Sequence, residues 1–79
     1  MKQERFINLA RLAGISQADA ARAMDVSPAT ASRVFNGERK LGLEPAARLL
    51  SFLNRPEHLA RLGRTAPITF EELFTEAAA

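Results

Sequence analysis

Apolar residues recur along this chain at the spacing of amphipathic helices rather than at the strict alternation of strands. Between residues 3 and 13, four apolar side chains stand at i, i+3, i+4 and i+7, which places them on one helix face: Phe6, Leu9, Ala10 and Ala13. Gly14 follows, and glycine readily takes the left-handed conformation that ends a helix. The pattern therefore predicts a first helix over residues 3–13.

Two serines mark the starts of the next two helices. Ser16 stands three residues before Asp19 in the spacing of a capping box, so a short alanine-rich helix starts at about residue 17. Ser27 precedes Pro28, which gives an N-cap residue followed by proline at the first helical position. This combination predicts a third helix that runs to Phe35.

A basic loop over residues 38–43 separates the third helix from a fourth, which Glu44 and Pro45 open. The fourth helix, over residues 44–53, carries an apolar stripe made of Ala46, Leu49, Leu50 and Leu53. Pro56 can begin a fifth, short helix that ends at residue 63.

A last helix is predicted over residues 70–77. Thr69 and Glu72 have the spacing of a capping box, and Ile68 and Leu73 are placed as the two partners of a hydrophobic staple. With few aromatic or β-branched runs, the chain is expected to be all-α, a compact bundle of five or six short helices.

The second and third helices are joined by only about four residues, 24–27, and helices so joined cross at roughly 90–120°, as in a helix-turn-helix. Such a crossing needs small residues at the contact, and Ala20 and Ala21 supply them. Asp25 occupies the turn, where it tolerates the left-handed conformation better than most residues do. The wedge behind the corner is expected to be filled by Met24, Val26, Ala31, Val34 and Phe35.

The third helix has two different faces. Ala31, Val34 and Phe35 point inward, and the outer face is small and polar, with one cation: Ala29, Ser32, Arg33 and Asn36. A helix that is only solvated would more often display Glu and Lys pairs. Short side chains with a few donors are instead what a helix in the DNA major groove needs, so helix 28–36 is predicted to read DNA.

Individual roles follow from that placement. The Arg33 guanidinium can bind guanine O6 and N7 with two hydrogen bonds, or it can contact a phosphate. Pro28 and Ala29, at the tip of the helix, can touch a thymine methyl group. The Thr30 and Ser32 hydroxyls can reach base edges or phosphate.

A second set of residues is predicted to contact phosphate. Ser16, Gln17 and Ser27 lie at helix N-termini, where unpaired N–H groups and the helix dipole attract anions, although capping alone would also explain the two serines. Arg39 and Lys40 follow the third helix and are well placed to contact the DNA backbone. The alternative for this pair is a solvated loop charge.

The amino-acid composition argues against several kinds of functional site. The 79 residues suit one small domain, and with no cysteine and one histidine they offer neither a disulfide nor a zinc site, so we expect no metal and no cofactor. His58 reads as a surface residue, and no titratable pair suggests catalysis, so we expect no enzyme. The opening MKQERF lacks the pattern of a signal peptide, and no apolar run is long enough for a membrane span. These features fit a cytoplasmic protein.

Charge divides the chain unevenly. Residues 1–64 hold all 11 Lys and Arg and six of the acids, whereas residues 65–79 hold three acids and no base. We therefore expect a DNA-binding domain over 1–64 and an acidic, helical tail over 65–79. A core this small usually needs a staple, and oligomerisation is the one remaining. Six apolar residues are expected to form a dimer contact, or alternatively to fold back on the first helix: Leu59, Leu62, Ile68, Phe70, Leu73 and Phe74.

Residues 16–37, SQADAARAMDVSPATASRVFNG, resemble the helix-turn-helix of bacterial and phage repressors. The stretch VSPATASRVFNG is similar to the headpiece of the lactose-repressor family, and PEHLAR at 56–61 to its hinge helix. A complete helix in front, the entry AGISQ over residues 13–17 and a fourth helix over 44–53 resemble the Cro/CI (Xre) family, which we favour. Asp25 in the turn and the single arginine on the third helix depart from the usual pattern.

Membership of that family implies a homodimer that represses by placing both recognition helices in the major groove of a palindromic operator, with half-sites about 34 Å apart. Two other functions stay open. One is an antitoxin-type module, whose tail wraps a small toxin protein while its body binds the promoter. The other is a purely structural helical adaptor, which would have no affinity for DNA at low salt.

Overall fold

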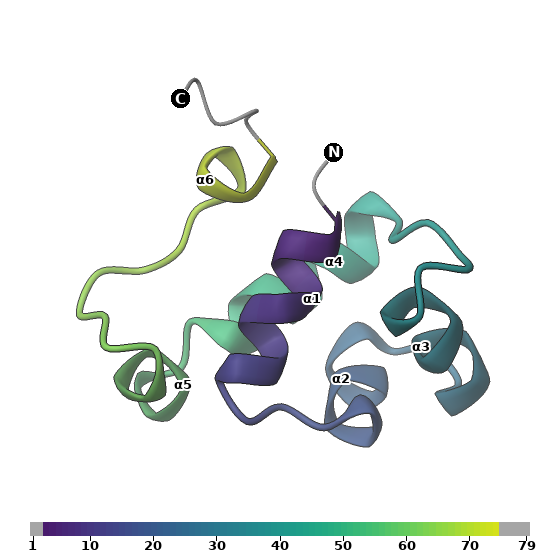
Figure 1. Cartoon of the computed structure of the whole chain (residues 1–79), viewed down its shortest axis with the longest axis horizontal. Helices are drawn as coiled ribbons and strands as arrows, with labels where there is room; N and C mark the ends of the chain where they lie inside the picture. The colour runs from purple at the N-terminus through teal and green to yellow at the C-terminus, as the bar shows by residue number, and fades with distance from the viewer. Residues whose placement is uncertain (1–2, 75–79) are drawn as a thin grey trace.

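The computed structural model describes residues 3–74, and residue 74 by its backbone only. In this part of the chain there are six helices and no strand (Figure 1), which confirms the predicted all-α fold. The helices are α1 (Gln3–Leu12), α2 (Gln17–Met24), α3 (Pro28–Phe35), α4 (Leu43–Leu53), α5 (Pro56–Arg61) and α6 (Phe70–Phe74). Within these residues no helix has the length and apolar run needed to cross a membrane.

The predicted N-caps are present. The Ser16 hydroxyl oxygen accepts the N–H of Asp19 at 3.0 Å, and the Ser27 oxygen accepts the N–H of Thr30 at 3.1 Å. At α6 the Thr69 oxygen accepts the N–H of residue 72 at 3.1 Å. Each bond satisfies a donor that a helix start would otherwise leave unpaired, so local sequence alone fixes where these helices begin.

Helix bounds differ slightly from the predicted ones. α1 ends at Leu12, α4 begins at Leu43 behind an N-cap Gly42, and α5 ends at Arg61. The predicted end of the last helix, residues 75–77, lies outside the described residues. These differences of one or two residues leave every element in its predicted place.

The turn of the helix-turn-helix is left-handed at Asp25, with φ 58° and ψ 47°, as predicted. Its backbone N–H donates to the carbonyl oxygens of Ala21 and Arg22, which closes α2. Its carboxylate also pairs with Arg48 of α4, at 3.3 Å. The side chain that tolerates the strained turn therefore ties the turn to the next layer of helices as well.

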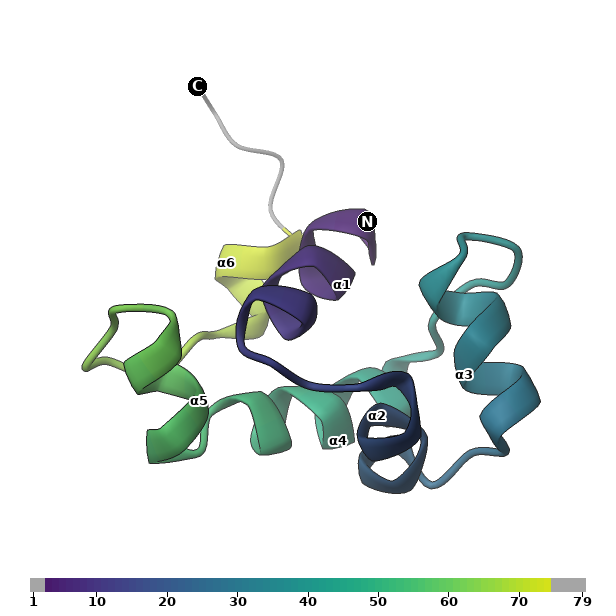
Figure 2. The ribbon, with the colours of Figure 1, turned by 60° about the horizontal axis from the view of Figure 1, so that its bottom comes forward.

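The core lies between α2 and its neighbours α3 and α4, and it continues under α1. Ala20 and Ala21 of α2 are buried, as expected for small residues where helices contact one another. The largest side chains that are fully buried come from all parts of the described chain: Phe6, Met24, Leu49, Leu53, Ile68 and Leu73. α3 lies at one end of the long axis and α5 at the opposite end (Figure 1, Figure 2).

The C-terminal apolar residues pack onto this core, whereas the sequence favours a contact with a partner. Ile68 and Leu73 are 2% and 0% exposed, and Leu59 is 7% exposed. α6 contacts α1, so the alternative of folding back on the first helix is the one observed. The reason is that α1 offers an apolar surface at no cost in association entropy. Leu62 and Phe70 are half-buried against the same core, and the Phe74 side chain lies outside the described residues.

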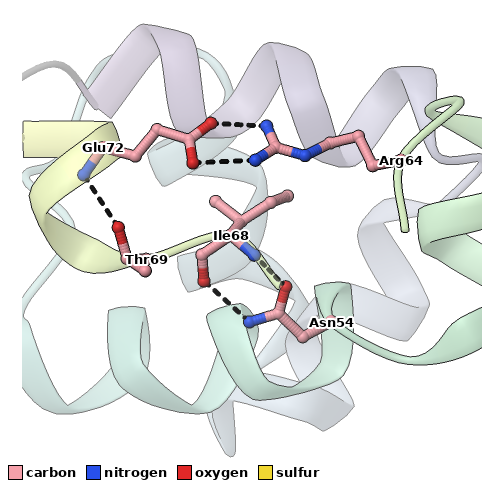
Figure 3. A network of polar contacts seen from close by, with 5 residues as sticks. All are labelled: Asn54, Arg64, Ile68, Thr69 and Glu72. Atoms are coloured by element: carbon pink, nitrogen blue, oxygen red, sulfur yellow. Dashed lines mark hydrogen bonds and ion pairs between the residues drawn. The ribbon is translucent and has the colours of Figure 1, made fainter. Parts of the chain in front are cut away.

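Two polar clasps hold the segment after α5 in place (Figure 3). The Asn54 amide donates to the carbonyl oxygen of Ile68 at 2.8 Å and accepts its N–H at 2.7 Å. Arg64 binds the Glu72 carboxylate with two hydrogen bonds, one of them at 2.8 Å. This pairing lowers the pKa of Glu72 and raises that of Arg64. These two clasps therefore join residues 54 and 64 to the segment over 65–79 that the sequence assigns to a tail.

Candidate DNA-binding surface

Helix α3 separates into the two faces that its sequence predicts. Ala31, Val34 and Phe35 are buried, with exposed fractions of 0%, 4% and 6%. On the outer face Ala29, Arg33 and Asn36 are exposed and Ser32 is half-buried. The buried face packs on α2 and leaves the outer face exposed. Helix α3 lies at one end of the molecule (Figure 2).

At the first turn of α3 the hydroxyl groups are occupied. The Ser27 oxygen caps the helix, and its O–H donates to the Thr30 hydroxyl oxygen at 2.9 Å. Thr30 is half-buried, whereas Pro28 is exposed at the tip. The Ser16 hydroxyl caps α2 in the same way. Capping thus accounts for both serines, and a phosphate contact by either remains a prediction.

Gln17, unlike the two serines, does not cap a helix with its side chain. It is exposed at the start of α2, and its side chain makes no hydrogen bond to any other residue from 3 to 74. Because α2 packs directly against α3, an exposed amide here lies on the helix pair that forms the motif. Of the three residues predicted at helix N-termini, it is the one whose side chain has no structural partner in the described chain.

The loop that follows α3 lies against that helix. Gly37, at φ +77°, ends α3, and the N–H of Glu38 donates to the carbonyl oxygen of Arg33 at 2.8 Å. Further on, Arg39 and Lys40 line a cavity of about 170 Å³ together with Thr30. The structure therefore brings the two predicted loop cations next to the predicted recognition helix.

The charges on this surface are mostly positive and unpaired. Arg33, Arg39 and Lys40 are exposed, and none forms an ion pair with any acid among residues 3–74. α3 contains no acid, and the nearest one in sequence is the exposed Glu38 of the loop. Elsewhere in the described chain, Arg22, Arg48 and Arg64 each bind a carboxylate. Cations without internal partners are the ones that remain for an external anion such as phosphate.

Two residues of α1 support this surface, and our reading of the sequence missed both. The Gln3 side-chain amide makes three hydrogen bonds with the backbone of α3 and its loop, at 2.8–3.2 Å. The Arg11 guanidinium donates to the carbonyl oxygen of Phe35 at 3.3 Å and lies 5.6 Å from the centre of that ring. The residues in each of these contacts are more than 20 positions apart in the chain, so no local sequence pattern predicts them.

Comparison with known proteins supports the same motif. A family model described as Helix-turn-helix matches residues 7–59, a span that begins in α1 and ends in α5. The comparisons with curated proteins and with solved structures give no match. The matched span includes α2, the turn at Asp25, α3 and the basic loop.

Proposed function

The chain belongs to the helix-turn-helix family of the Xre/Cro-CI-like type and is a DNA-binding regulator, and from this premise we propose that it acts as a dimeric repressor. In this proposal α3 enters the major groove of a palindromic operator. Two copies bind half-sites about 34 Å apart and exclude polymerase from promoter DNA. No chemical step is involved, and neither a metal nor a cofactor is required.

One observation carries the proposal, namely the contrast between the two faces of α3. The face with Ala31 and Val34 is sealed into the core, and the face with Ala29 and Arg33 projects with small side chains and one cation. Small side chains allow a helix to approach base edges closely, and a guanidinium there can hold guanine through two hydrogen bonds. We therefore assign direct reading of bases to Ala29, Arg33 and the exposed Asn36.

The other predicted contacts serve position rather than sequence reading. Arg39 and Lys40 would neutralise backbone phosphates, with Gln17 doing the same at the start of α2. Pro28 would pack on a thymine methyl group, and the half-buried Ser32 would reach a phosphate or a base edge. The hydroxyls that cap helices contribute by fixing the helix N-termini, whose remaining N–H groups point outward.

A dimer follows in this proposal from the size of the reading surface, because one short helix offers too few contacts for operator-level affinity. The contact surface must lie outside the core residues Ile68 and Leu73. The outer sides of α5 and α6, where Leu62 and Phe70 keep part of their surface exposed, are the remaining part of the region that we predicted.

The antitoxin alternative has less support. It relied on a helical tail that is available to wrap another protein. The described part of that tail is clasped to Asn54 and Arg64 and buries Leu73, so no surface feature favours this function over repression.

Selection of binding sites from random duplex DNA, followed by the mass of the complex, tests the proposal. We expect a palindromic consensus bound by two chains. Arg33→Ala should then cost about 1–3 kcal/mol on the selected site and blur one position of the consensus. Arg55→Ala is the control, because this exposed arginine is the N-cap residue of α5 at the opposite end of the molecule, where it lies near Glu57 and Phe52. Equal effects of the two variants, or no enriched sequence, would refute the assignment.

A further inference from the structure

We propose that Gln3 is a positioning residue that holds the loop cations Arg39 and Lys40 in place for contact with DNA phosphates. The proposal rests on the proposed function, because it concerns how that surface is prepared. Gln3 opens α1 and is half-buried, and it is not one of the residues that would touch DNA. Its role is inferred from what its side-chain amide binds.

The amide uses both its donor and its acceptor groups on the same segment. Its nitrogen donates to the carbonyl oxygen of Val34 at 3.2 Å and to that of Arg39 at 2.8 Å. Its oxygen accepts the backbone N–H of Leu41 at 2.8 Å. The last two bonds lie on either side of Lys40, and the first lies in the final turn of α3. One side chain therefore ties the recognition helix and the loop together.

No other side chain in the described residues forms a hydrogen bond with the backbone of residues 39–41. The backbone N–H groups of Glu38 and Arg39 bond back to the carbonyl oxygen of residue 33, which fixes only the start of the loop. Beyond residue 39, the next backbone bond of this kind is from Ala46 to Gly42, at the start of α4. Lys40 stands in the gap between these two sets, where the Gln3 amide supplies the backbone partners.

A loop held in this way reaches DNA already ordered. Without the amide, the backbone around Lys40 would keep the buried Leu41 side chain as its anchor but would lose its hydrogen bonds, and the added conformational entropy would oppose the contact. The loss of affinity should come from the phosphate contacts of the loop, which do not depend on the DNA sequence. It should not appear in the sequence preference of α3.

The test uses Gln3→Met, which keeps the length of the side chain and removes all three hydrogen bonds. The probe is a fluorescein-labelled duplex of mixed sequence, titrated by anisotropy between about 50 and about 200 mM salt. We expect Q3M to bind roughly three- to tenfold more weakly and its salt slope to fall by up to about two units, one for each loop cation. Asn8→Ala is the control, because Asn8 is exposed on α1 and has no side-chain hydrogen bond in the described residues. Like Gln3, it lines the cavity between α1 and the loop that follows α3.

A second arm separates positioning from a general loss of structure. In the background R39A/K40A, Q3M should have no further effect on affinity, because the groups that it positions are gone. An equal loss in both backgrounds would overturn the proposal, since the residue would then act through overall stability. Unchanged binding by Q3M, with R39A/K40A clearly weakened, would also overturn it while leaving the proposed function intact. Unchanged binding of the mixed-sequence duplex by R39A/K40A, together with an unchanged affinity of R33A for the selected site, would overturn both.

Thermal unfolding first establishes that Q3M is folded at the assay temperature. If it is not, Gln3→Glu replaces it, because a carboxylate keeps the bond from the Leu41 N–H and loses the two bonds to carbonyl oxygens. Asn8→Glu then serves as the control, with the same added charge on the same helix. A drop in affinity and salt slope for Q3E beyond that of N8E supports the proposal, and equal drops overturn it.

Discussion

The substitution Leu73→Ala tests whether the C-terminal segment belongs to the core of a single chain. Leu73 is 0% exposed in α6, which packs on α1. Truncation of a buried leucine to alanine costs about 2–5 kcal/mol, depending on how well the site collapses. Because α6 is short and lies near the end of the chain, collapse is easy, and we expect about 2–3 kcal/mol. For a domain of this size, such a loss corresponds to a decrease in Tm of roughly 10–20 °C.

Circular dichroism during heating measures this change, and it should be repeated over a wide range of protein concentration. Leu12→Ala is the matched control: the same atoms are removed, but Leu12 is 70% exposed, so its effect should stay within about 0.5 kcal/mol. The difference between the two variants should not depend on concentration, because Leu73 is buried within one chain. A destabilisation that fades on dilution, or equal effects of the two variants, would instead place α6 in a contact between chains.

Two further predictions concern the Arg64–Glu72 pair and the glycines that follow α1 and α3. Glu72→Gln should remove part of the acid sensitivity of the fold. The pairing with Arg64 lowers the pKa of Glu72, so the stability that the pair contributes is complete at neutral pH and is lost as pH falls below the usual range of a glutamate. Unfolding of the wild-type protein and the variant at neutral and acidic pH checks this, and parallel pH profiles would contradict it. Gly14→Ala and Gly37→Ala each force alanine to a positive φ, of +81° and +77°, and should cost about 1–2 kcal/mol each in urea unfolding. The two costs should be similar, because the methyl group at residue 14 meets only the end of the flexible, exposed Arg61 side chain, which can move, and that at residue 37 meets open space.

The elements that the sequence predicts well are those encoded within a few residues. Ser16 and Ser27 cap the helices that they precede, and Asp25 takes the left-handed turn conformation, because each of these depends only on neighbours in the chain. The two faces of α3 follow from helical periodicity in the same way. The candidate surface was therefore predictable as far as it consists of α3 itself.

Contacts between distant segments were not predictable in this way. The apolar spacing of Ile68 and Leu73 shows that they need a partner surface, but α1 of the same chain and a second chain satisfy that need equally well. Likewise nothing near Gln3 in the sequence indicates that its amide meets residues 34–41. Asn54, whose amide binds the backbone of residue 68, gives no local signal either. Side-chain amides of this kind are identified only once the fold has placed them.

The polar contacts that hold α6 on the core also weaken one argument for a dimer. The argument from size was that a chain of 79 residues without cysteine needs a second copy to be stable. The described chain holds staples of its own, in the Asn54 bonds to residue 68 and the Arg64–Glu72 pair, and they close α6 over the core. A folded monomer is therefore expected, and the remaining reason for a dimer is the small reading surface of α3. It follows that dimerisation should be weak in free solution and should be driven by an operator that offers two half-sites in register.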